Sequence, residues 1–288
     1  MRLDAQLAKL FPNYSRSQLQ QFIADGRVTV NGKVITKSSF PVSDDDLAML
    51  NEPISPDFSR ELSEFKKHVV YIDDNVVVVN KPAGVLVHAK GGTGCEFTVA
   101  DYVKSVFDVD ELTQNADNNR LGIVHRLDRA TSGIIICARN LKTASMLSRQ
   151  FAERKAKKTY LAVVSKEPKE LSATINLPIG RNLSKPSTFK VSPSGKVAIT
   201  DYDVLETRKD GFTLVELKPH TGRTHQLRVH MSYIGSPIVG DPIYGTGKFG
   251  DRLMLHAWKL EISIPGANGN VRKTFIADPP KEFTFNGK

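Results

Sequence analysis

An aspartate flanked by two arginines stands at the centre of residues 120–139 and offers the clearest chemistry in this sequence. Asp128 lies between Arg126 and Arg129, and a Thr-Ser-Gly triplet separates it from an apolar run at 134–137. An ionised carboxylate can act as a nucleophile or as a general base. The alternative is a turn residue whose side chain hydrogen-bonds a nearby backbone amide.

The elements beside this aspartate favour a functional loop. The run at 134–137 is short, rich in β-branched residues and bounded by Gly133 and Arg139, which predicts a buried strand. Ile123 and Val124 form a shorter apolar pair before the aspartate. The carboxylate is therefore expected on a turn between two buried segments, and a rigid scaffold that presents a loop residue commonly builds a site.

A second polar stretch spans residues 219–230 and reads Pro-His-Thr-Gly-Arg-Thr-His-Gln-Leu-Arg-Val-His. Leu227, Met231 and Ile234 recur at helical spacing, so this stretch is expected to lead into a helix. Its three histidines are five residues apart, which places successive rings roughly 140° apart around a helix. Such rings do not converge, and no cysteine or acid joins them, so we expect no metal site.

These two stretches resemble the main motifs of the RluA family of RNA pseudouridine synthases. The matching residues are His-Arg-Leu-Asp-x-x-Thr-Ser-Gly at 125–133 and Thr-Gly-Arg-x-His-Gln-Leu-Arg-x-His at 221–230. The Asn-Lys-Pro element that contains Lys81 and the Gly-Asp-Pro-Ile-Tyr-Gly turn at 240–245 are also shared with the family. Lys81 is either close to the site or an exposed lysine before a turn.

The resemblance implies a role for each of five residues. Asp128 would be catalytic, and Arg228 would lie against its carboxylate, which favours the ionised form. Tyr160, at the end of a Lys-x-Tyr pattern, would stack on the target uracil, with Leu227 on the other side; without the resemblance it would be a core or cross-strand tyrosine. Arg126 would fill the gap that the extruded uridine leaves in the RNA.

The implied reaction breaks the glycosidic bond of uridine, turns the uracil and rejoins it through carbon 5. Nothing is oxidised and no group is imported, so we expect no cofactor. Asp128 would attack carbon 6 of the ring or the anomeric carbon, or would remove a ribose proton to give a glycal. The sequence leaves these three routes open.

The first part of the chain resembles an RNA-binding domain of the ribosomal-S-four type. Two helical patterns are followed by Arg27-Val-Thr-Val-Asn-Gly-Lys33, in which Asn-Gly predicts a two-residue hairpin turn. We divide the chain into a small RNA-binding domain at 1–52, a linker at 53–68 and a catalytic domain at 69–288. The candidate phosphate contacts are Arg16, Arg27, Lys33, Lys37, Arg129 and Arg223.

The expected fold class is α+β. The resemblance implies the pseudouridine synthase fold, with a mixed, mostly antiparallel central sheet flanked by helices and a small N-terminal α/β domain. Within the catalytic domain we predict a hairpin, helices at 98–107 and after Asn140, and a loop at 181–196. The remaining predicted strands are at 158–164, 198–206, 212–218, 253–257 and 259–264.

Charge and composition point to a polyanionic partner. The net charge is +9 and the pI is about 9.4; residues 139–158 carry seven Lys or Arg against one acid, and residues 181–196 carry four against none. No apolar run approaches the roughly 20 residues that span a bilayer. The two cysteines, Cys95 and Cys137, have no metal-ligand spacing. We expect a cytoplasmic monomer that binds RNA and no membrane.

Three classes of function remain open from the sequence. The first is an isomerase acting on large-subunit ribosomal RNA, with transfer RNA as the alternative substrate. The second is a non-catalytic RNA-binding assembly protein with the same fold, against which the presence of Asp128, Tyr160 and Arg228 argues. The third is a His/Asp nuclease, which would cleave the strand and depend on a metal.

Overall fold

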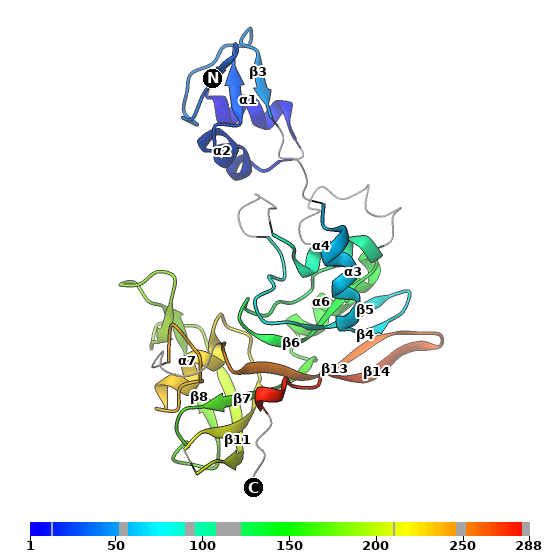
Figure 1. Cartoon of the computed structure of the whole chain (residues 1–288), viewed down its shortest axis with the longest axis vertical. Helices are drawn as coiled ribbons and strands as arrows, with labels where there is room; N and C mark the ends of the chain where they lie inside the picture. The colour runs from blue at the N-terminus through cyan, green and yellow to red at the C-terminus, as the bar shows by residue number, and fades with distance from the viewer. Residues whose placement is uncertain are drawn as a thin grey trace.

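The computed structural model describes residues 1–12, 14–51, 57–89, 96–107, 122–209, 211–245 and 252–283. Figure 1 shows a small N-terminal domain and a larger region that contains most of the strands. Each has its own cluster of buried apolar side chains. Cys95 and the stretch 108–120 of the sequence lie outside the described residues.

The N-terminal domain packs two helices on a small sheet. Helices α1 (Leu3–Leu10) and α2 (Arg16–Ala24) precede β1 (Val28–Val30), β2 (Lys33–Val34) and β3 (Ala48–Leu50), which have the order β2-β1-β3. The predicted hairpin is confirmed, with positive φ angles in its Asn-Gly turn. The third strand escaped prediction because it is three residues long and follows an acidic turn. The core consists of Leu3, Leu7, Leu19, Phe22, Ile23, Val28, Val30 and Val42.

The segment predicted as a linker contains ordered structure. Helix α3 (Ser59–Phe65) and a 3₁₀ turn, η1 (Lys66–His68), occupy its second half. Phe65 is buried, and its ring lies 5.1 Å from that of Tyr102. The second half of 53–68 therefore packs onto the larger region, through Phe65 together with the half-buried Leu62 and with Phe58, whose ring lies 5.6 Å from that of Phe97.

The larger region is built on one mixed sheet. Its strands are β4 (Val69–Ile72), β5 (Val76–Lys81), β6 (Ser132–Ala138), β7 (Lys157–Val164), β8 (Ser172–Asn176), β11 (Ile199–Thr207), β12 (Thr213–Pro219), β13 (Leu255–Gly266) and β14 (Gly269–Ile276). Their order is β4-β5-β6-β13-β7-β12-β11-β8, and β14 pairs with β13. Strands β6 and β13 run parallel and the other neighbours are antiparallel, which confirms the expected fold class.

Two helices cover opposite faces of β5 and β6. Helix α4 (Val99–Val106), which begins at a Thr98 capping box, packs with the strand residues of one parity, among them Val77 and Ile135. Helix α6 (Leu141–Ala152), capped by Asn140, packs with the other parity. Side chains alternate between the two faces of a sheet along a strand, so each helix contacts the strand residues that point to its own face. Leu141, predicted to face inward, is 38% exposed at the first helical position.

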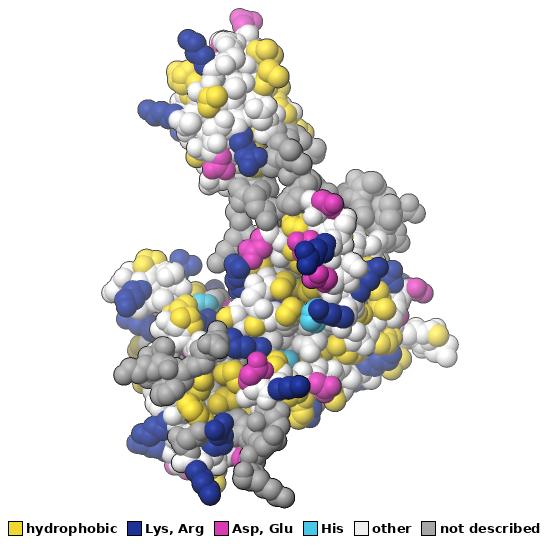
Figure 2. Space-filling model, in the orientation of Figure 1, with side chains coloured by type: hydrophobic (Ala, Val, Ile, Leu, Met, Phe, Trp, Pro, Cys, Tyr) yellow, Lys and Arg dark blue, Asp and Glu magenta, His cyan; other side chains and the backbone are white. Residues whose placement is uncertain are grey.

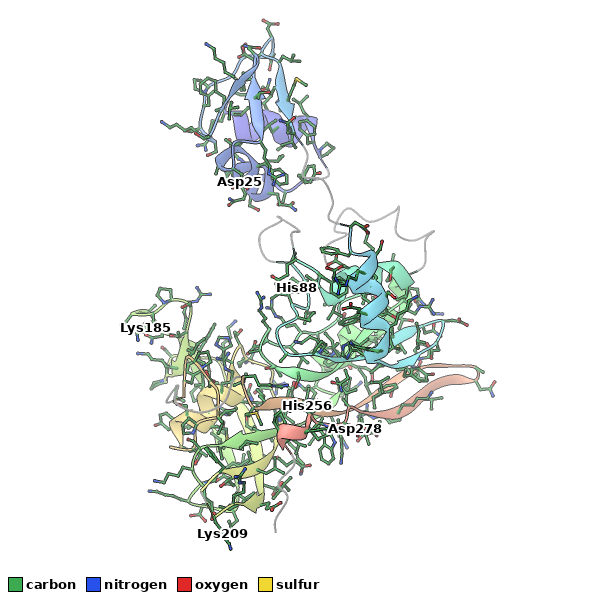
Figure 3. All side chains as sticks on the ribbon, in the orientation of Figure 1. Asp25, His88, Lys185, Lys209, His256 and Asp278 are labelled. Atoms are coloured by element: carbon green, nitrogen blue, oxygen red, sulfur yellow. The ribbon has the colours of Figure 1, made fainter. Side chains whose placement is uncertain are left out.

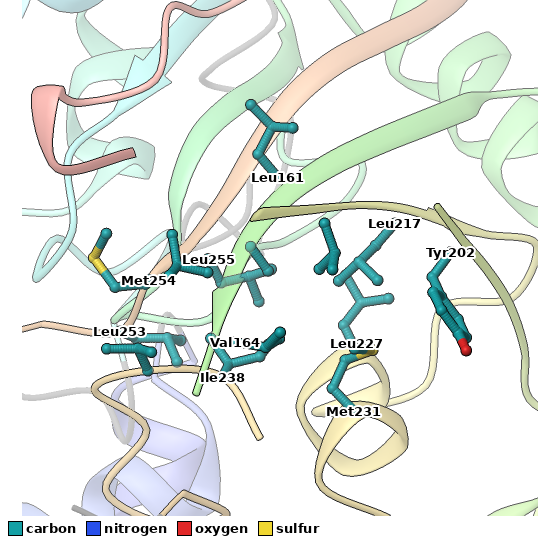
Figure 4. Packing of buried hydrophobic residues seen from close by; sticks show 14 of the residues in the cluster. Leu161, Val164, Tyr202, Leu217, Leu227, Met231, Ile238, Leu253, Met254 and Leu255 are labelled. Atoms are coloured by element: carbon teal, nitrogen blue, oxygen red, sulfur yellow. The ribbon is translucent and has the colours of Figure 1, made fainter. Parts of the chain in front are cut away.

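Helix α7 (Gln226–Tyr233) packs on the other half of the sheet. Figure 4 shows Leu227 and Met231 of this helix beside Leu217 of β12. The burial of this apolar face fixes which side chains of α7 remain available for the site. Among the described residues, no helix combines the length and apolar composition needed to cross a membrane.

Two parts of this region differ from the prediction. The loop predicted at 181–196 includes a hairpin of β9 (Ile179–Arg181) and β10 (Phe189–Val191), and Figure 3 shows Lys185 at its outer end. The tail after residue 266 forms β14, which pairs with β13 along its whole length. Both hairpins are stabilised by pairing with a partner strand rather than by a strong apolar pattern of their own.

Candidate active site

Asp128 lies in the loop directly before β6, as the sequence predicts. The loop turns through a hydrogen bond from the Thr131 N–H to the Asp128 carbonyl, at 3.1 Å. Gly133 follows at φ +114°, and a Cβ there would lie 2.2 Å from the carbonyl oxygen of Ala257 in β13. Only glycine allows this close approach of β6 to β13. The loop therefore leaves the sheet at a fixed point.

Lys81 supports the Asp128 loop from the end of β5. Its side chain is fully buried, and its Nζ donates to the carbonyl oxygens of Pro82, Val85 and Arg129 at 2.9, 2.9 and 3.2 Å. Burial lowers the pKa of Lys81 to about 7, although the nearby negative charge of Asp128 acts in the opposite direction. The interpretation of Lys81 as an exposed lysine is wrong.

His125 fixes the other side of the loop. The backbone N–H of Ile136 in β6 donates to its Nε2 at 3.0 Å, and its ring stacks on Phe151 with centroids 4.4 Å apart. A nitrogen that accepts this bond carries no proton, and burial lowers the pKa of His125 to about 3. His125 is therefore a neutral group that attaches the loop to the sheet.

Arg228 reaches Asp128 from α7, one hundred residues further along the chain. Its Nη1 lies 3.4 Å from Asp128 Oδ2; the Arg228 side chain is 5% exposed and the Asp128 side chain is 27% exposed. The predicted carboxylate–guanidinium pair is present in the structure. The contact is long for a charge-assisted hydrogen bond, so Asp128 is not held tightly by it.

A second carboxylate, Asp241, grips the same arginine more closely. Its two oxygens accept from Arg228 Nε and Nη2 at 2.7 and 2.8 Å, and its side chain is fully buried. Burial would lower the pKa of Arg228, but the pairing with Asp241 raises it overall. Burial likewise would raise the pKa of Asp241, but the guanidinium of Arg228 lowers it overall. Both groups are therefore charged, and Arg228 has a fixed orientation.

Asp241 was not predicted as part of the site. It belongs to the turn at 240–245, and an aspartate before a proline is typical of a turn. Asp241 indeed accepts the backbone N–H groups of Ile243 and Tyr244, at 2.9 and 3.1 Å. The available signals were an acid in the turn and an arginine in the preceding helix, whose guanidinium has enough donors for a second carboxylate.

Tyr244 and His225 complete the surroundings of Asp128. The guanidinium carbon of Arg228 lies 5.1 Å from the centre of the Tyr244 ring. The Tyr244 Oη is 2.8 Å from His225 Nδ1, and His225 Nε2 is 3.8 Å from Asp128 Oδ2. Neither residue was predicted as part of the site.

Tyr160 and Leu227 are brought into one apolar cluster. Tyr160 lies on β7, paired with Ala257 of β13, and Leu227 lies on α7 with 7% of its surface exposed. Burial raises the pKa of the Tyr160 phenol, and the negative charge of Asp128 raises it further, so the phenol is neutral. An uncharged aromatic ring and an aliphatic side chain can both contact a flat base.

The predicted RNA contacts have different surroundings. Arg126 is exposed, whereas Arg129 pairs with Glu96 at 2.5 and 3.3 Å and the Nε of Arg223 donates to the Val197 carbonyl at 3.0 Å. Those in the N-terminal domain are the half-buried Arg27 and the exposed Arg16, Lys33 and Lys37.

The basic run at 139–158 does not form a single surface. Arg139 donates to the carbonyls of Val106 and Asp73, and burial lowers the pKa of Lys158. The exposed members are Lys142, Arg149, Arg154, Lys155 and Lys157. Figure 2 shows Lys and Arg side chains scattered over both parts of the molecule on the visible face.

The three histidines of the second motif have separate partners. His220 Nε2 lies 2.6 Å from Asp201, and His225 Nδ1 bonds Tyr244. His230 is buried between the Thr200 hydroxyl and the Leu177 carbonyl. Within the described ranges, no group of three His, Cys, Asp or Glu side chains could hold a metal ion.

Comparison with protein families gives two matches. Residues 75–233 match the RNA pseudouridylate synthase family, and residues 1–47 match the S4 domain. The first match covers Asp128, Tyr160 and Arg228. The second covers the helices α1 and α2 and the hairpin β1–β2.

Similar proteins point the same way. "Ribosomal large subunit pseudouridine synthase D" of Borreliella burgdorferi is 37% identical over 294 residues, which cover 99% of this chain and 88% of that protein. The protein of the same name from Vibrio parahaemolyticus is 35% identical over 232 residues, covering 81% and 69%.

Two solved human structures share the fold. "Human RNA Pseudouridylate Synthase Domain Containing 1" has a TM-score of 0.55 and 33% identity, covering 73% of this chain and 83% of that one. "Human RNA Pseudouridylate Synthase Domain Containing 4" has a TM-score of 0.59 and 25% identity, covering 78% and 93%. With its carboxylate–arginine site, its fold and these matches, the chain belongs to the RNA pseudouridylate synthase family.

Proposed function

We propose that Asp128 is the catalytic residue with which this enzyme converts uridine to pseudouridine in large-subunit ribosomal RNA. The observation that carries the proposal is the arrangement around its carboxylate. Asp128 is partly exposed, and its arginine partner is held in place by the buried Asp241. An ionised oxygen is thereby presented at the surface of a rigid scaffold.

The surroundings suit the chemistry of the carboxylate. Arg228 lies beside this carboxylate and, being fixed by Asp241, needs no rearrangement when the uridine binds. Asp128 attacks carbon 6 of the uracil or the anomeric carbon, or removes a ribose proton to give a glycal. In each route the same oxygen reacts, so one substitution tests all three.

We assign substrate contacts to four further side chains. Tyr160 packs against the apolar cluster that contains Leu227, and a flipped uracil that stacks there gains about 1–3 kcal/mol. Arg228 orients the carboxylate. Arg126 is exposed two residues before Asp128 and can enter the gap left in the RNA, a step that offsets unstacking of a few kcal/mol.

RNA outside the site is bound by basic side chains of both parts. We assign phosphate contacts to exposed or half-exposed cations; their binding releases counterions from the RNA phosphates, so RNA affinity depends on salt. These residues are Arg16, Arg27, Lys33, Lys37, Arg129 and Arg223. For Arg129, binding competes with its ion pair to Glu96.

The choice of ribosomal RNA is supported by the relatives named above, and the S4 domain at residues 1–47 fits a structured RNA substrate. Transfer RNA is the alternative. Mapping pseudouridines in both RNA classes from a strain that lacks this gene distinguishes them. Loss of a modification from transfer RNA alone would overturn the choice of substrate and leave the role of Asp128 intact.

The test of the catalytic residue is release of tritium from RNA labelled at carbon 5 of uracil. Wild-type protein is expected to release tritium, and Asp128→Asn is expected to release none above background. Asp203→Asn, which changes a surface carboxylate paired with Lys218, serves as the matched control. Activity retained by Asp128→Asn would contradict the proposal, as would strand cleavage in place of isomerisation. That the enzyme is a cytoplasmic monomer is a further prediction, tested by light scattering and cell fractionation.

A further inference from the structure

Tyr244 contacts both of the groups that face Asp128. Its ring lies beneath the Arg228 guanidinium, 5.1 Å from the guanidinium carbon, and its hydroxyl lies 2.8 Å from His225 Nδ1. Arg228 Nη1 and His225 Nε2 both approach the same oxygen of Asp128, Oδ2, at 3.4 and 3.8 Å. Both groups therefore approach Oδ2, and within the described part of the chain no hydrogen bond or ion pair engages Oδ1.

The hydrogen bonds around Tyr244 determine which ring nitrogen of a neutral His225 carries the proton. The backbone N–H of Phe189 in β10 donates to the Tyr244 Oη at 2.8 Å, so the phenol can direct its own proton to His225 Nδ1. Nδ1 then accepts, and the ring proton of a neutral His225 is on Nε2. A donor thus faces the negatively charged Asp128.

The backbone of His225 is held in an unusual conformation to achieve this. His225 precedes α7 with φ +56°, in the left-handed region that non-glycine residues seldom occupy. Such a conformation is strained and persists where the surroundings enforce it, often at functional sites. The edges of Phe189 and Tyr244 contact the ring, with centroids 5.6 and 5.5 Å away.

We infer that His225, anchored by Tyr244, is a positioning residue that holds Oδ2 of Asp128 and directs Oδ1 toward the uridine. The inference rests on the proposed catalytic role of Asp128. His225 acts through that carboxylate rather than on the substrate, so it should affect the chemical step more than RNA binding. Its essential property is a hydrogen-bond donor, which a glutamine amide can partly replace.

The experiment measures single-turnover rates and RNA affinity for variants of His225, His220 and Tyr244. His225→Ala is expected to lower the rate about 10- to 100-fold, with RNA affinity changed less than about twofold, because a misplaced group mainly impairs the reacting geometry. His225→Gln is expected to recover most of that loss. His220→Ala, which removes a nearby histidine paired with Asp201, is the matched control and should keep the wild-type rate.

The role of Tyr244 is tested by combining substitutions. Tyr244→Phe should lower the rate less than His225→Ala does, since the ring under Arg228 remains. The double variant should be no slower than His225→Ala alone, because the two residues act through one chain of contacts.

Several results would overturn the inference: a wild-type rate for His225→Ala, no recovery with His225→Gln, a loss confined to RNA affinity, or additive effects in the double variant. Melting temperatures establish that each variant is folded, and if His225→Ala unfolds, His225→Gln and Tyr244→Phe carry the test. Asp128→Asn is assayed in parallel. If it is active, the proposed catalytic residue is wrong; if it is inactive while His225→Ala is normal, only the inference about His225 fails.

Discussion

Two aspartates, one in each part of the molecule, pair with arginine but differ in burial and in the number of hydrogen bonds that they accept. Asp4 in the N-terminal domain is fully buried and accepts hydrogen bonds from Arg2, Arg16 and Gln20 at 2.6–3.2 Å. Asp128 is 27% exposed, and among the described residues its one hydrogen bond to a side chain comes from Arg228 at 3.4 Å.

The contrast shows what separates a structural carboxylate from an available one. Burial would raise the pKa of Asp4, but the hydrogen bonds from Arg16, Gln20 and Arg2 lower it well below its usual range. Those donors occupy both oxygens. Arg228 cannot do the same for Asp128, because Asp241 already binds two of its nitrogens. The availability of Asp128 therefore depends on a third residue.

The largest expected difference is between asparagine substitutions of the two aspartates. Asp128→Asn should reduce activity by at least about 10³-fold, the scale seen when a reacting group is removed, with little change in melting temperature. Asp4→Asn should leave the rate on a short RNA nearly unchanged and destabilise the N-terminal domain by about 1–3 kcal/mol, because donors to a buried carboxylate lose their charged partner. Tritium release and thermal melting measure the two effects. Equal effects of the two variants on activity would refute the comparison.

The next effect concerns the residue that makes Asp128 available. Asp241→Asn removes the closer of the two carboxylates that neutralise the buried Arg228, which should destabilise the protein by about 3–5 kcal/mol and lower activity as well. Urea unfolding measures the change, with the surface variant Asp203→Asn as its control. A change below about 1 kcal/mol would mean that Arg228 does not need Asp241.

His125 and Asp4 should lose their contributions to stability over different pH ranges. The pKa of His125 is lowered to about 3, so its stabilising contribution is complete above its unfolded pKa near 6.5 and is lost as the pH falls toward 3. The lowered pKa of Asp4 keeps its contribution until the pH falls below about 4. Between pH 7 and 4.5 the wild type should lose roughly 1–2 kcal/mol more than His125→Gln. Parallel stability curves for the two proteins would show that His125 does not carry this dependence.

The smallest effect is expected from the exposed cations of the N-terminal domain. Lys33→Gln should weaken RNA binding a few-fold and reduce the salt dependence of binding by about one charge, with the catalytic rate unchanged. Filter binding at several salt concentrations measures this. Arg16→Gln should additionally lower the stability of the domain, since Arg16 is a partner of Asp4. If neither variant changed the dependence of RNA affinity on salt concentration, RNA would bind to another surface of the protein.

Short-range patterns were sufficient for much of the fold and for the position of Asp128. The apolar run at 134–137 became β6, Asn31-Gly32 became a hairpin turn, and Asn140 became a helix cap, since each depends on neighbours a few residues away. The weakly patterned β14 and β10 were missed, because pairing with another strand stabilises them.

By itself, the sequence determined the loop that carries Asp128, its flanking strand, the basic character and the family resemblance. Only the tertiary structure decided that Lys81 is buried, that Asp241 clamps Arg228 and that His225 faces Asp128. The physical reason is distance along the chain. Packing of α7 against the sheet brings together groups one hundred residues apart, and no local periodicity or capping preference encodes which donor meets which carboxylate.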